Sequence, residues 1–473
     1  MVGMRETGGH GLPAGYRRIL VVGAGRSGLG AAAVLAAMGR EVLLSDSKDR
    51  ADLPGVAGAE ARGARFLDPP QDAAHLDGVD LVIKSPGVPG EAEVVRAARE
   101  RGLPVWSELE LAYRLFPQPF TAVTGTNGKT TTTALLGHMF RTAGRPARIL
   151  GNIGVAVTSV AGTLAPDEEL VVELSSFQLE DVHTFRPAAG ILLNLTQDHL
   201  DRHGTMGRYL ACKANLFAHQ RTEDWAVLNL DDPAVAGLGR EIATRRGGPR
   251  LLFFSTAGAP AAGSRLVEGR LYLLGRPALA VGDLALRGLH NVENCLAAGT
   301  AALARGLELE AVVEALRTFP GVPHRLQRAG VVAGVAYVND SKATNVEATL
   351  KALGAYPAGT HLILGGRDKG SDYRPIARAC VGACRGVYLI GEAAPLIREA
   401  FARVREDEGR AGVPVPRECG DLETAVKAAS RAARAGETVL LAPACASFDQ
   451  YRDFEERGDH FMAIVAKLGG GRG

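Results

Sequence analysis

The chain has 473 residues, of which 46% are hydrophobic and 22% are charged, and its formal net charge is +2 at pH 7. This length exceeds what one hydrophobic core supports and favours about three domains. The near-neutral charge argues against nucleic acid or a membrane surface as a partner. No apolar stretch reaches the roughly 18 residues of a membrane helix, and the six cysteines show no disulfide framework. No secretory signal pattern opens the chain, so we expect a cytoplasmic protein.

The first α/β segment carries a nucleotide-binding fingerprint. A buried-strand pattern at 17–22 leads into Gly23-Ala24-Gly25-Arg26-Ser27-Gly28 and then into an Ala-rich helical pattern. A second strand pattern at 41–46 ends in Asp46, about 20 residues beyond the glycines, as the G-x-G-x-x-G fingerprint requires. The fingerprint indicates a nucleotide or phosphate at a helix N-terminus, but it does not specify NAD.

Turn and linker residues set the limits that we expect for this first domain. Residues 1–16 are rich in glycine and polar side chains, and we expect them to form a loose tail. A third strand pattern at 80–84 is followed by helical patterns up to Leu115, and Pro117-Gln118-Pro119 then indicates a linker. We therefore place the first domain at 17–116, with its ligand at the carboxyl ends of the strands.

A glycine-rich run at 124–132, Thr-Gly-Thr-Asn-Gly-Lys-Thr-Thr-Thr, is the most informative motif. An apolar strand pattern precedes it and a helical pattern follows, which places backbone N–H groups and a helix N-terminus around an anion. Lys129 offers a charge for phosphate oxygens and Thr130 a hydroxyl for Mg²⁺. The run departs from the P-loop pattern because Val123 stands where the first glycine belongs. The order of the parts nevertheless favours a nucleoside triphosphate site over a turn that binds nothing.

The P-loop variant opens a central domain that we place at 117–322. A second linker, Phe319-Pro320-Gly321-Val322-Pro323, closes it. Its further strand patterns lie at 148–150, 170–174, 190–193, 225–228 and 251–254. Helical patterns lie at 290–304 and 309–316.

The last part of the chain, 323–473, alternates strand and helix patterns once more. Strands are expected at 336–339, 361–364, 386–390 and 438–441, and helices at 346–353, 396–404 and 422–435. Cys380 and Cys384 fall on one helical pattern and are expected to face the core. Such alternation predicts an α/β fold of three domains, each with a mainly parallel sheet: Rossmann-like, P-loop ATPase-like and Rossmann-like in turn.

Two polar runs follow strands of the central domain. Glu173 ends one strand on the same sheet edge as the P-loop, where a carboxylate suits Mg²⁺, although it could also cap a helix. The run 194–203 holds two His and two Asp, and a solvated loop is its alternative interpretation.

Lys213, on a helical pattern at 209–217, invites a chemical explanation. An exposed helical lysine is ordinarily a solubilising charge. However, only nine of the 54 Lys and Arg residues in this chain are lysines. A lysine offers a compact charge or a modifiable amine, and arginine offers neither.

The third domain has polar runs at three strand ends. They are 339–345, 364–370 and 441–450, and the first two contain Lys342 and Lys369. Because the carboxyl ends of parallel strands meet at one sheet edge, we expect these runs to form one binding site.

Taken together, these motifs resemble those of the Mur ligases, the amide-forming enzymes of bacterial peptidoglycan synthesis. Residues 125–130 are similar to the shortened P-loop of that family, and the resemblance extends from about Arg17 to about Lys467. The runs 173–179, 339–345 and 443–449 resemble those of the member that adds D-glutamate. The resemblance implies an ATP-dependent ligase that joins D-glutamate to UDP-N-acetylmuramoyl-L-alanine through an acyl phosphate and a tetrahedral intermediate.

The resemblance also implies roles for individual residues. The catalytic set would be Lys129, Glu173, His199 and Lys213. Two Mg²⁺ ions would be held by Thr130, Glu173, His199 and Lys213, the last as a carbamylated lysine. ATP would contact Gly125, Thr126, Asn127, Gly128, Lys129, Thr130, Thr131, Thr132, Asn291, Asn294, Arg325 and Asp340. The UDP substrate would contact Ser27, Asp46, Ser47, Gly87 and Asn152. D-Glutamate would contact Lys342, Thr344, Lys369, Ser447, Phe448 and Phe454.

Two positions depart from the family pattern. Lys48 stands where an arginine is common, which keeps the charge but not bidentate phosphate contact, and Arg367 stands where an acid is sometimes found. Another ligase of the superfamily, such as folylpolyglutamate synthetase, is the nearest alternative. An NAD-dependent oxidoreductase or a regulatory nucleotide-binding module are the others. We expect a monomer without nucleic-acid or membrane partners.

Overall fold

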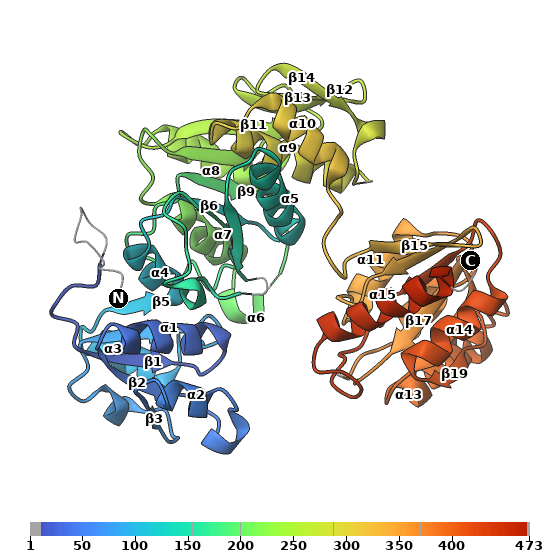
Figure 1. Cartoon of the computed structure of the whole chain (residues 1–473), viewed down its shortest axis with the longest axis horizontal. Coiled ribbons are helices and arrows are strands. Elements are labelled where there is room, and N and C mark those ends of the chain that lie inside the picture. Colours follow the sequence, from blue (N-terminus) through green and yellow to red (C-terminus); the bar gives the residue numbers. More distant parts are fainter. Residues whose placement is uncertain (1–10, 153–154, 199, 287, 369, 471–473) are drawn as a thin grey trace. The chain divides into compact units, whose positions relative to one another are not determined.

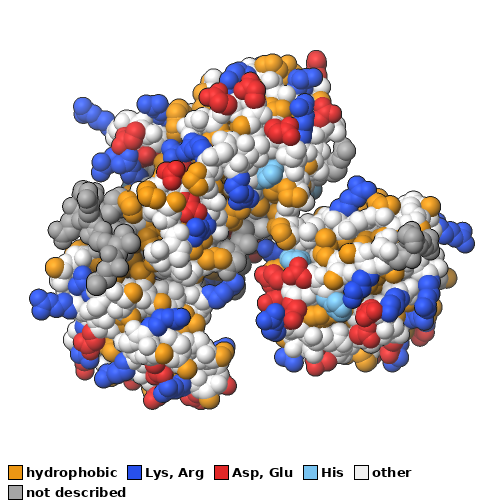
Figure 2. All heavy atoms as spheres, in the orientation of Figure 1, with side chains coloured by type: hydrophobic (Ala, Val, Ile, Leu, Met, Phe, Trp, Pro, Cys, Tyr) orange, Lys and Arg blue, Asp and Glu red, His pale blue; other side chains and the backbone are white. Residues whose placement is uncertain are grey.

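The computed structural model describes residues 11–152, 155–198, 200–286, 288–368 and 370–470. The chain divides between Phe319 and Pro320 into two compact units (Figure 1). The first unit contains two sheets and the second contains one. Acidic and basic side chains are interspersed on the face of each unit that Figure 2 shows. Within the described residues, no helix combines the length and apolar character needed to cross a membrane.

The first sheet has the strand order β3-β2-β1-β4-β5 and parallel pairing throughout. Its strands are β1 (Arg18–Val22), β2 (Glu41–Ser45), β3 (Ala64–Leu67), β4 (Leu81–Lys84) and β5 (Val105–Ser107). Its helices are α1 (Arg26–Ala37), α2 (Val56–Glu60), α3 (Glu93–Glu100) and α4 (Glu108–Leu115). The predicted succession of strand, glycine turn and helix is confirmed in β1 and α1, whereas the short strands β3 and β5 were not predicted.

The second sheet has the order β14-β13-β12-β11-β10-β9-β6-β8-β7. Its strands are β6 (Phe120–Thr124), β7 (Ala147–Gly151), β8 (Glu169–Glu173), β9 (Ala189–Leu192), β10 (Trp225–Asn229), β11 (Arg250–Ser255), β12 (Gly263–Val267), β13 (Arg270–Leu273) and β14 (Arg276–Ala280). Its helices are α5 (Lys129–Thr142), α6 (Leu200–His203), α7 (Met206–Ala214), α8 (Pro233–Ala243), α9 (Leu289–Ala304) and α10 (Leu309–Thr318). Within this order, all neighbouring strands between β12 and β7 pair in parallel. The antiparallel extension through β13 and β14 was not predicted.

The third sheet, in the second unit, has the order β15-β16-β20-β17-β18-β19. Its strands are β15 (Gln327–Val332), β16 (Val335–Asn339), β17 (Thr360–Gly365), β18 (Cys384–Ile390), β19 (Arg417–Gly420) and β20 (Thr438–Leu441). Its helices are α11 (Val346–Ala355), α12 (Arg374–Ala379), α13 (Ala394–Asp407), α14 (Leu422–Ala432) and α15 (Phe454–Gly470). Only β15 pairs antiparallel among these strands. The predicted fold class, three mainly parallel α/β sheets, is confirmed.

One local prediction in the second unit is wrong. Cys380 and Cys384 do not share a helix, because α12 ends at Ala379 and Cys384 begins β18. Their spacing of four residues matched a helical period, but a turn separates them. Cys380 is nevertheless buried and Cys384 packs against the same core.

Helix α4 joins the two sheets of the first unit through two buried acids. Glu108 Oε1 accepts hydrogen bonds from Thr158 N at 2.5 Å and Thr158 Oγ1 at 2.7 Å. Glu110 Oε2 accepts from the backbone N–H groups of His183, Thr184 and Phe185 at 2.9–3.0 Å. Burial raises the pKa of Glu108. Burial acts in the same direction on Glu110, but the hydrogen bonds outweigh it and lower its pKa. The two sheets of the first unit are therefore joined by a continuous core and by these polar contacts.

Candidate functional site

The glycine-rich loop between β6 and α5 is held in shape by side chains from two other elements. Gly128 has a φ of 83°, and a Cβ there would lie 2.3 Å from Asn294 Oδ1, so this position requires glycine. Asn194 Oδ1, just beyond β9, accepts from the N–H groups of Thr126 at 3.1 Å and Asn127 at 2.8 Å. Asn194 belongs to a predicted polar run, but sequence reasoning assigned it no role.

Two lysines converge on this loop. Lys129 Nζ donates to the carbonyl oxygens of Gly125 at 3.1 Å and Thr126 at 2.8 Å. Lys213 Nζ, from α7, also donates to Gly125 O, at 2.8 Å, and contacts Thr124 Oγ1 at 3.4 Å. The structure therefore brings together two lysines that the sequence placed in separate motifs.

Lys213 is buried, with 1% of its surface exposed, so the interpretation as an exposed solubilising lysine is wrong. Its Nζ lies 4.5 Å from the ring centroid of Tyr209. Burial, assisted by the nearby charge of Lys129, lowers the pKa of Lys213 to about 7. This environment therefore favours the neutral, nucleophilic form of the amine.

Glu173 lies at the end of β8 beside the loop and is 2% exposed. Its Oε1 accepts from Asn152 Nδ2 at 2.9 Å, while its buried Oε2 has no hydrogen-bond partner among the described residues. No helix follows Glu173 directly, so the helix-capping alternative is wrong. An unpaired buried carboxylate oxygen near a phosphate-type loop suits a hard cation.

The other predicted metal ligands are less fully described. Thr130 is in the first turn of α5 and is 7% exposed. His199 lies outside the described residues. In the part of the chain that the structure describes, no three His, Cys, Asp or Glu side chains form a metal-binding group. The predicted magnesium ligands would not form such a group, because they include a threonine hydroxyl and a lysine that would be carbamylated.

Helix α9 brings two predicted ATP residues to the P-loop helix α5. Asn294 Oδ1 accepts from Thr132 Oγ1 at 3.3 Å, and Asn294 Nδ2 donates to Asn291 Oδ1 at 3.1 Å. Asn294 thus contacts α5 and Asn291 contacts Asn294, although a large part of the central domain separates helices α5 and α9 in sequence. Arg325 and Asp340 belong to the second unit.

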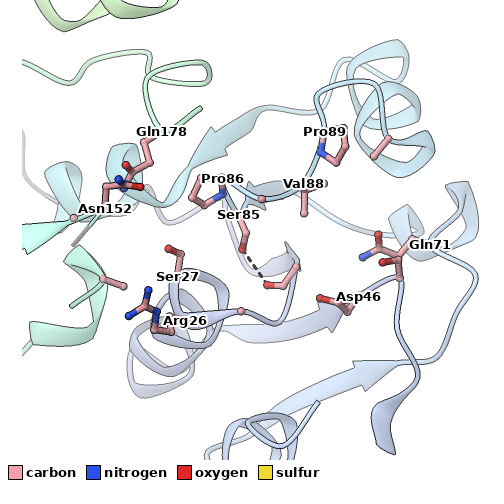
Figure 3. Close-up of a pocket in the computed structure, with 17 residues that line it drawn as sticks. Arg26, Ser27, Asp46, Gln71, Ser85, Pro86, Val88, Pro89, Asn152 and Gln178 are labelled. Carbon is pink, nitrogen blue, oxygen red and sulfur yellow. Dashed lines mark hydrogen bonds between the residues drawn. The ribbon is translucent and has the colours of Figure 1, made fainter. Parts of the chain in front are cut away.

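A pocket of about 470 Å³ opens at the carboxyl ends of the first sheet (Figure 3). Its lining includes all of the residues predicted to contact the UDP substrate, namely Ser27, Asp46, Ser47, Gly87 and Asn152. Arg26, Gln71, Ser85 and Gln178 also line it and were not predicted. Lys48, where the family pattern has arginine, is not among the lining residues.

The floor of this pocket is a tight glycine turn. Gly23 has a φ of 97°, and a Cβ there would lie 2.8 Å from Ser85 Cβ. Ser85 Oγ donates to Gly23 O at 3.0 Å, the dashed line in Figure 3. Asp46 Oδ2 accepts from Ala24 N at 2.7 Å, so the predicted acid also closes the glycine turn. The pocket is thus preformed for an extended polar ligand beside the start of α1.

In the second unit, the three predicted polar runs do meet. They follow β16, β20 and β17, which are neighbours in the sheet and parallel. The buried guanidinium of Arg457 ties them together. It donates to Ser341 Oγ and Ser341 O, both at 2.9 Å, and to Cys445 O at 3.2 Å. It also donates to Gly365 O at 3.5 Å and Ala446 O at 3.4 Å. Sequence reasoning missed Arg457, because nothing in its helical run marks it as buried.

Of the side chains predicted to contact D-glutamate, Lys342, Thr344, Ser447 and Phe448 lie in two of these polar runs, and Phe454 begins α15. Lys342 Nζ lies 5.7 Å from the ring centroid of Phe454. Ser447 is buried, Thr344 is half-buried and Phe448 is 59% exposed. Lys369 lies outside the described residues.

Asp340 lies beside this junction and is 6% exposed. Its Oδ1 accepts from Leu326 N at 3.1 Å. Burial raises the pKa of Asp340 to about 6 despite that hydrogen bond and the nearby Arg325 and Lys342.

Comparison with known proteins identifies the protein family to which the chain belongs. The solved structure of UDP-N-acetylmuramate-alanine ligase MurC from Thermotoga maritima matches with a TM-score of 0.57 at 19% identity, over 95% of this chain and 99% of that one. A UDP-N-acetylmuramoyl-L-alanyl-D-glutamate--2,6-diaminopimelate ligase matches with 0.56 at 20%, over 90% and 93%. These two likenesses establish the fold. Three family models match in sequence: Mur ligase MurD-like, N-terminal domain (17–107); Mur ligase middle domain (123–302); and Mur ligase, glutamate ligase domain (324–445). The chain belongs to the Mur ligase family.

Two relatives that share one name are similar to this chain over nearly its whole length. The protein named UDP-N-acetylmuramoylalanine--D-glutamate ligase from Pelotomaculum thermopropionicum is 44% identical over 462 residues, covering 96% of this chain and 98% of that protein. The protein of the same name from Solibacter usitatus is 43% identical over 452 residues, covering 95% and 98%. The resemblance inferred from the motifs is confirmed.

Proposed function

We propose that this Mur ligase joins D-glutamate to UDP-N-acetylmuramoyl-L-alanine at the expense of ATP. The observation that carries the proposal is the match, over 95–96% of the chain, to ligases that bear this name. The first domain (17–116) would bind the sugar nucleotide, the central domain (117–322) would bind ATP, and the third domain (323–473) would bind D-glutamate. The enzyme would act as a monomer in the cytoplasm, in peptidoglycan synthesis.

The reaction needs an activated acid, because a carboxylate and an amine do not condense in water. A carboxylate oxygen of UDP-N-acetylmuramoyl-L-alanine attacks the γ-phosphorus, and the bond to the bridging oxygen breaks with release of ADP. The amine of D-glutamate then attacks the acyl carbon. The tetrahedral intermediate collapses as inorganic phosphate leaves and the nitrogen loses a proton, which yields the amide. The first step depends mainly on positioning and charge neutralisation.

The glycine-rich loop supplies that positioning for ATP. Its N–H groups and the start of α5 would receive the phosphates, and Lys129 would exchange its carbonyl acceptors for phosphate oxygens. Asn291 and Asn294 stand beside α5, where the base and sugar would lie. Arg325 and Asp340, which belong to the second unit, are further proposed ATP-binding residues.

Magnesium fits the residues at this site. The unpaired Oε2 of Glu173 and the hydroxyl of Thr130 would hold one ion, and His199 with Lys213 would hold a second. Bound magnesium neutralises phosphate charge during transfer. Asn152, which lines the sugar-nucleotide pocket, donates to the other oxygen of Glu173 and so orients the carboxylate.

Carbamylation would make Lys213 an oxygen ligand. The lone pair of the neutral amine attacks CO₂, a C–N bond forms and the nitrogen loses a proton, leaving a carbamate. Burial favours the neutral amine, since it lowers the pKa of Lys213 to about 7. Arginine could not undergo this reaction.

Phosphate release tests the proposed function. The purified chain is incubated with ATP, Mg²⁺ and UDP-N-acetylmuramoyl-L-alanine, together with D-glutamate, L-glutamate or no amino acid. We expect phosphate release only with D-glutamate, with a matching mass gain on the sugar nucleotide. Release with a different amino acid would move the assignment within the family, and no release under any condition would contradict it.

A further inference from the structure

One wall of the sugar-nucleotide pocket is held by a side chain from helix α6, which follows strand β9 of the second sheet. Pro86, Val88 and Pro89 line the pocket and lie together along one side of it in Figure 3. Arg202, in α6, donates from Nη1 to Pro86 O at 3.1 Å and from Nη2 to Val88 O at 2.7 Å. These two bonds fix the backbone of the wall on both sides of Gly87.

The guanidinium of Arg202 is itself held in place. Its central carbon lies 4.2 Å from the ring centroid of Phe177, and Nη2 lies 3.5 Å from Glu180 Oε2. Glu180 also pairs with the buried Lys84, at 2.7 Å. Arg202 is only 18% exposed, so its position is set by packing and charge rather than by solvent.

The segment that carries Arg202 also reaches the P-loop. Thr196 N, a few residues earlier, donates to Thr126 Oγ1 at 3.0 Å, and Thr126 Oγ1 donates back to Thr196 O at 3.2 Å. Asn194 binds the same loop. Asn194 and Thr196 therefore contact the nucleotide loop, and Arg202 contacts the pocket wall.

We propose that Arg202 is a positioning residue that sets the wall of the sugar-nucleotide pocket. An arginine is needed because one planar group must donate to two carbonyls while its face covers an aromatic ring. A lysine can place its charge there but cannot make all three contacts. Arg202 acts through backbone carbonyls, so it governs affinity for the sugar nucleotide rather than the chemical step. The inference rests on the proposed function for the identity of the ligand.

Binding and steady-state measurements on Arg202→Ala and Arg202→Lys test the proposal. We expect calorimetric affinity for UDP-N-acetylmuramoyl-L-alanine, and for UDP alone, to fall about tenfold in Arg202→Ala and less in Arg202→Lys. The KM for the sugar nucleotide should rise by the same factor, while kcat and the KM for D-glutamate stay within about twofold of the unmodified enzyme. Unchanged affinity in both variants would overturn the proposal, as would equal losses in kcat and in both KM values.

Arg99→Ala is the matched control. Arg99 also donates to a carbonyl of the same loop, that of Gly90 at 2.8 Å, and pairs with Asp181 at 2.7 Å, but Gly90 does not line the pocket. Its affinity for the sugar nucleotide should stay within about twofold. If Arg99→Ala weakened binding as much as Arg202→Ala, the loop would be sensitive to any lost contact and the specific role of Arg202 would be refuted.

A double-mutant cycle with Phe177→Leu separates positioning from loss of fold. We expect Phe177→Leu to weaken sugar-nucleotide binding in the same direction, and the double variant to be no worse than Arg202→Ala alone. Additive losses would contradict the proposal. Should Arg202→Ala fail to fold, Arg202→Lys and Phe177→Leu carry the same test. UDP binding is measured without turnover, so it remains decisive even if no D-glutamate-dependent phosphate release is found.

Discussion

Two buried lysines in the first unit have opposite surroundings. Lys84, at the end of β4, and Lys213, in α7, are each 1% exposed. Lys84 Nζ lies 2.7 Å from Glu180 Oε2 and 2.9 Å from Asp181 Oδ2. Among the described residues, Lys213 Nζ contacts no carboxylate and donates to a carbonyl and a hydroxyl. Burial alone therefore does not mark a lysine as chemically active; the charge of its partners does.

This difference follows from the cost of burying charge. Two carboxylates offset the desolvation of the Lys84 ammonium, so that lysine stays a structural cation between the two sheets. The oxygen acceptors of Lys213 carry no formal charge, and Lys129 adds repulsion, so the pKa of Lys213 falls to about 7. The first environment stabilises a charge, and the second favours the neutral amine.

The largest effect is expected from Lys213→Arg. The substitution keeps a cation but removes the amine that would be carbamylated, so kcat for D-glutamate-dependent phosphate release should fall by at least about 1,000-fold. Lys351→Arg is the control, because Lys351 is an exposed lysine paired with Glu347 at 2.6 Å, and it should keep full activity. A Lys213→Arg enzyme with more than a tenth of the normal rate would show that this lysine acts only as a charge.

Lys84→Met should affect stability instead of chemistry. It leaves Glu180 and Asp181 without their shared cation, although Arg202 and Arg99 still neutralise part of their charge. We expect a loss of about 3 kcal/mol in the free energy of unfolding of the first unit. Urea unfolding of the full chain measures it. The double variant Lys84→Met/Asp181→Asn should recover part of the loss, and no recovery would mean that Lys84 stabilises by packing alone.

Asp340 extends the comparison to a buried acid in the second unit. Burial raises its pKa from 3.8 to about 6, so the folded state holds a proton in this window that the unfolded state has released. Stability therefore falls as pH rises from about 4 to 6, by about 3 kcal/mol in all. Asp340→Asn, which keeps an oxygen for Leu326 N, should melt higher than the unmodified chain at pH 8 and gain little at pH 4. A gain that is equal at both pH values would contradict this.

The smallest effect is expected from Thr124→Val. Thr124 Oγ1 donates to Leu174 O at 2.8 Å and lies 3.4 Å from Lys213 Nζ. Removing this hydroxyl should cost about 1 kcal/mol of stability and change kcat by less than about threefold, since the amine keeps its carbonyl partner. Thermal unfolding and steady-state kinetics check both values. A loss of activity as large as that of Lys213→Arg would make the hydroxyl part of the chemistry.

Local sequence patterns predicted the parts of the fold that depend on neighbouring residues. The turn after β1, the loop before α5 and most strands of the parallel sheets have strong period and glycine signals, and they are confirmed. Strands β12, β13 and β14 were missed although they pair with near neighbours in sequence. Each is only four or five residues long, and the turns between them, Glu268-Gly269 and Leu274-Gly275, lack the Asn-Gly or Asp-Gly signal of a hairpin.

Sequence patterns predicted candidate site residues that lie inside motifs. They missed residues whose hydrogen-bond partners come from distant parts of the chain. All of the residues predicted for the UDP substrate line one pocket, since each follows a strand end. Arg202, in a polar run, and Arg457, by contrast, carry no signal in the sequence that marks their contacts. Only tertiary structure shows that each packs against backbone carbonyls from a different segment. The partners of Lys84, likewise, are set by how the two sheets pack.

The most direct test of the contrast between the two lysines is ¹³C NMR of the protein equilibrated with ¹³C-labelled bicarbonate. We expect one carbamate resonance in the unmodified chain and in Lys84→Met, and none in Lys213→Arg. A carbamate signal that persists in Lys213→Arg, or no signal in the active unmodified enzyme, would contradict it.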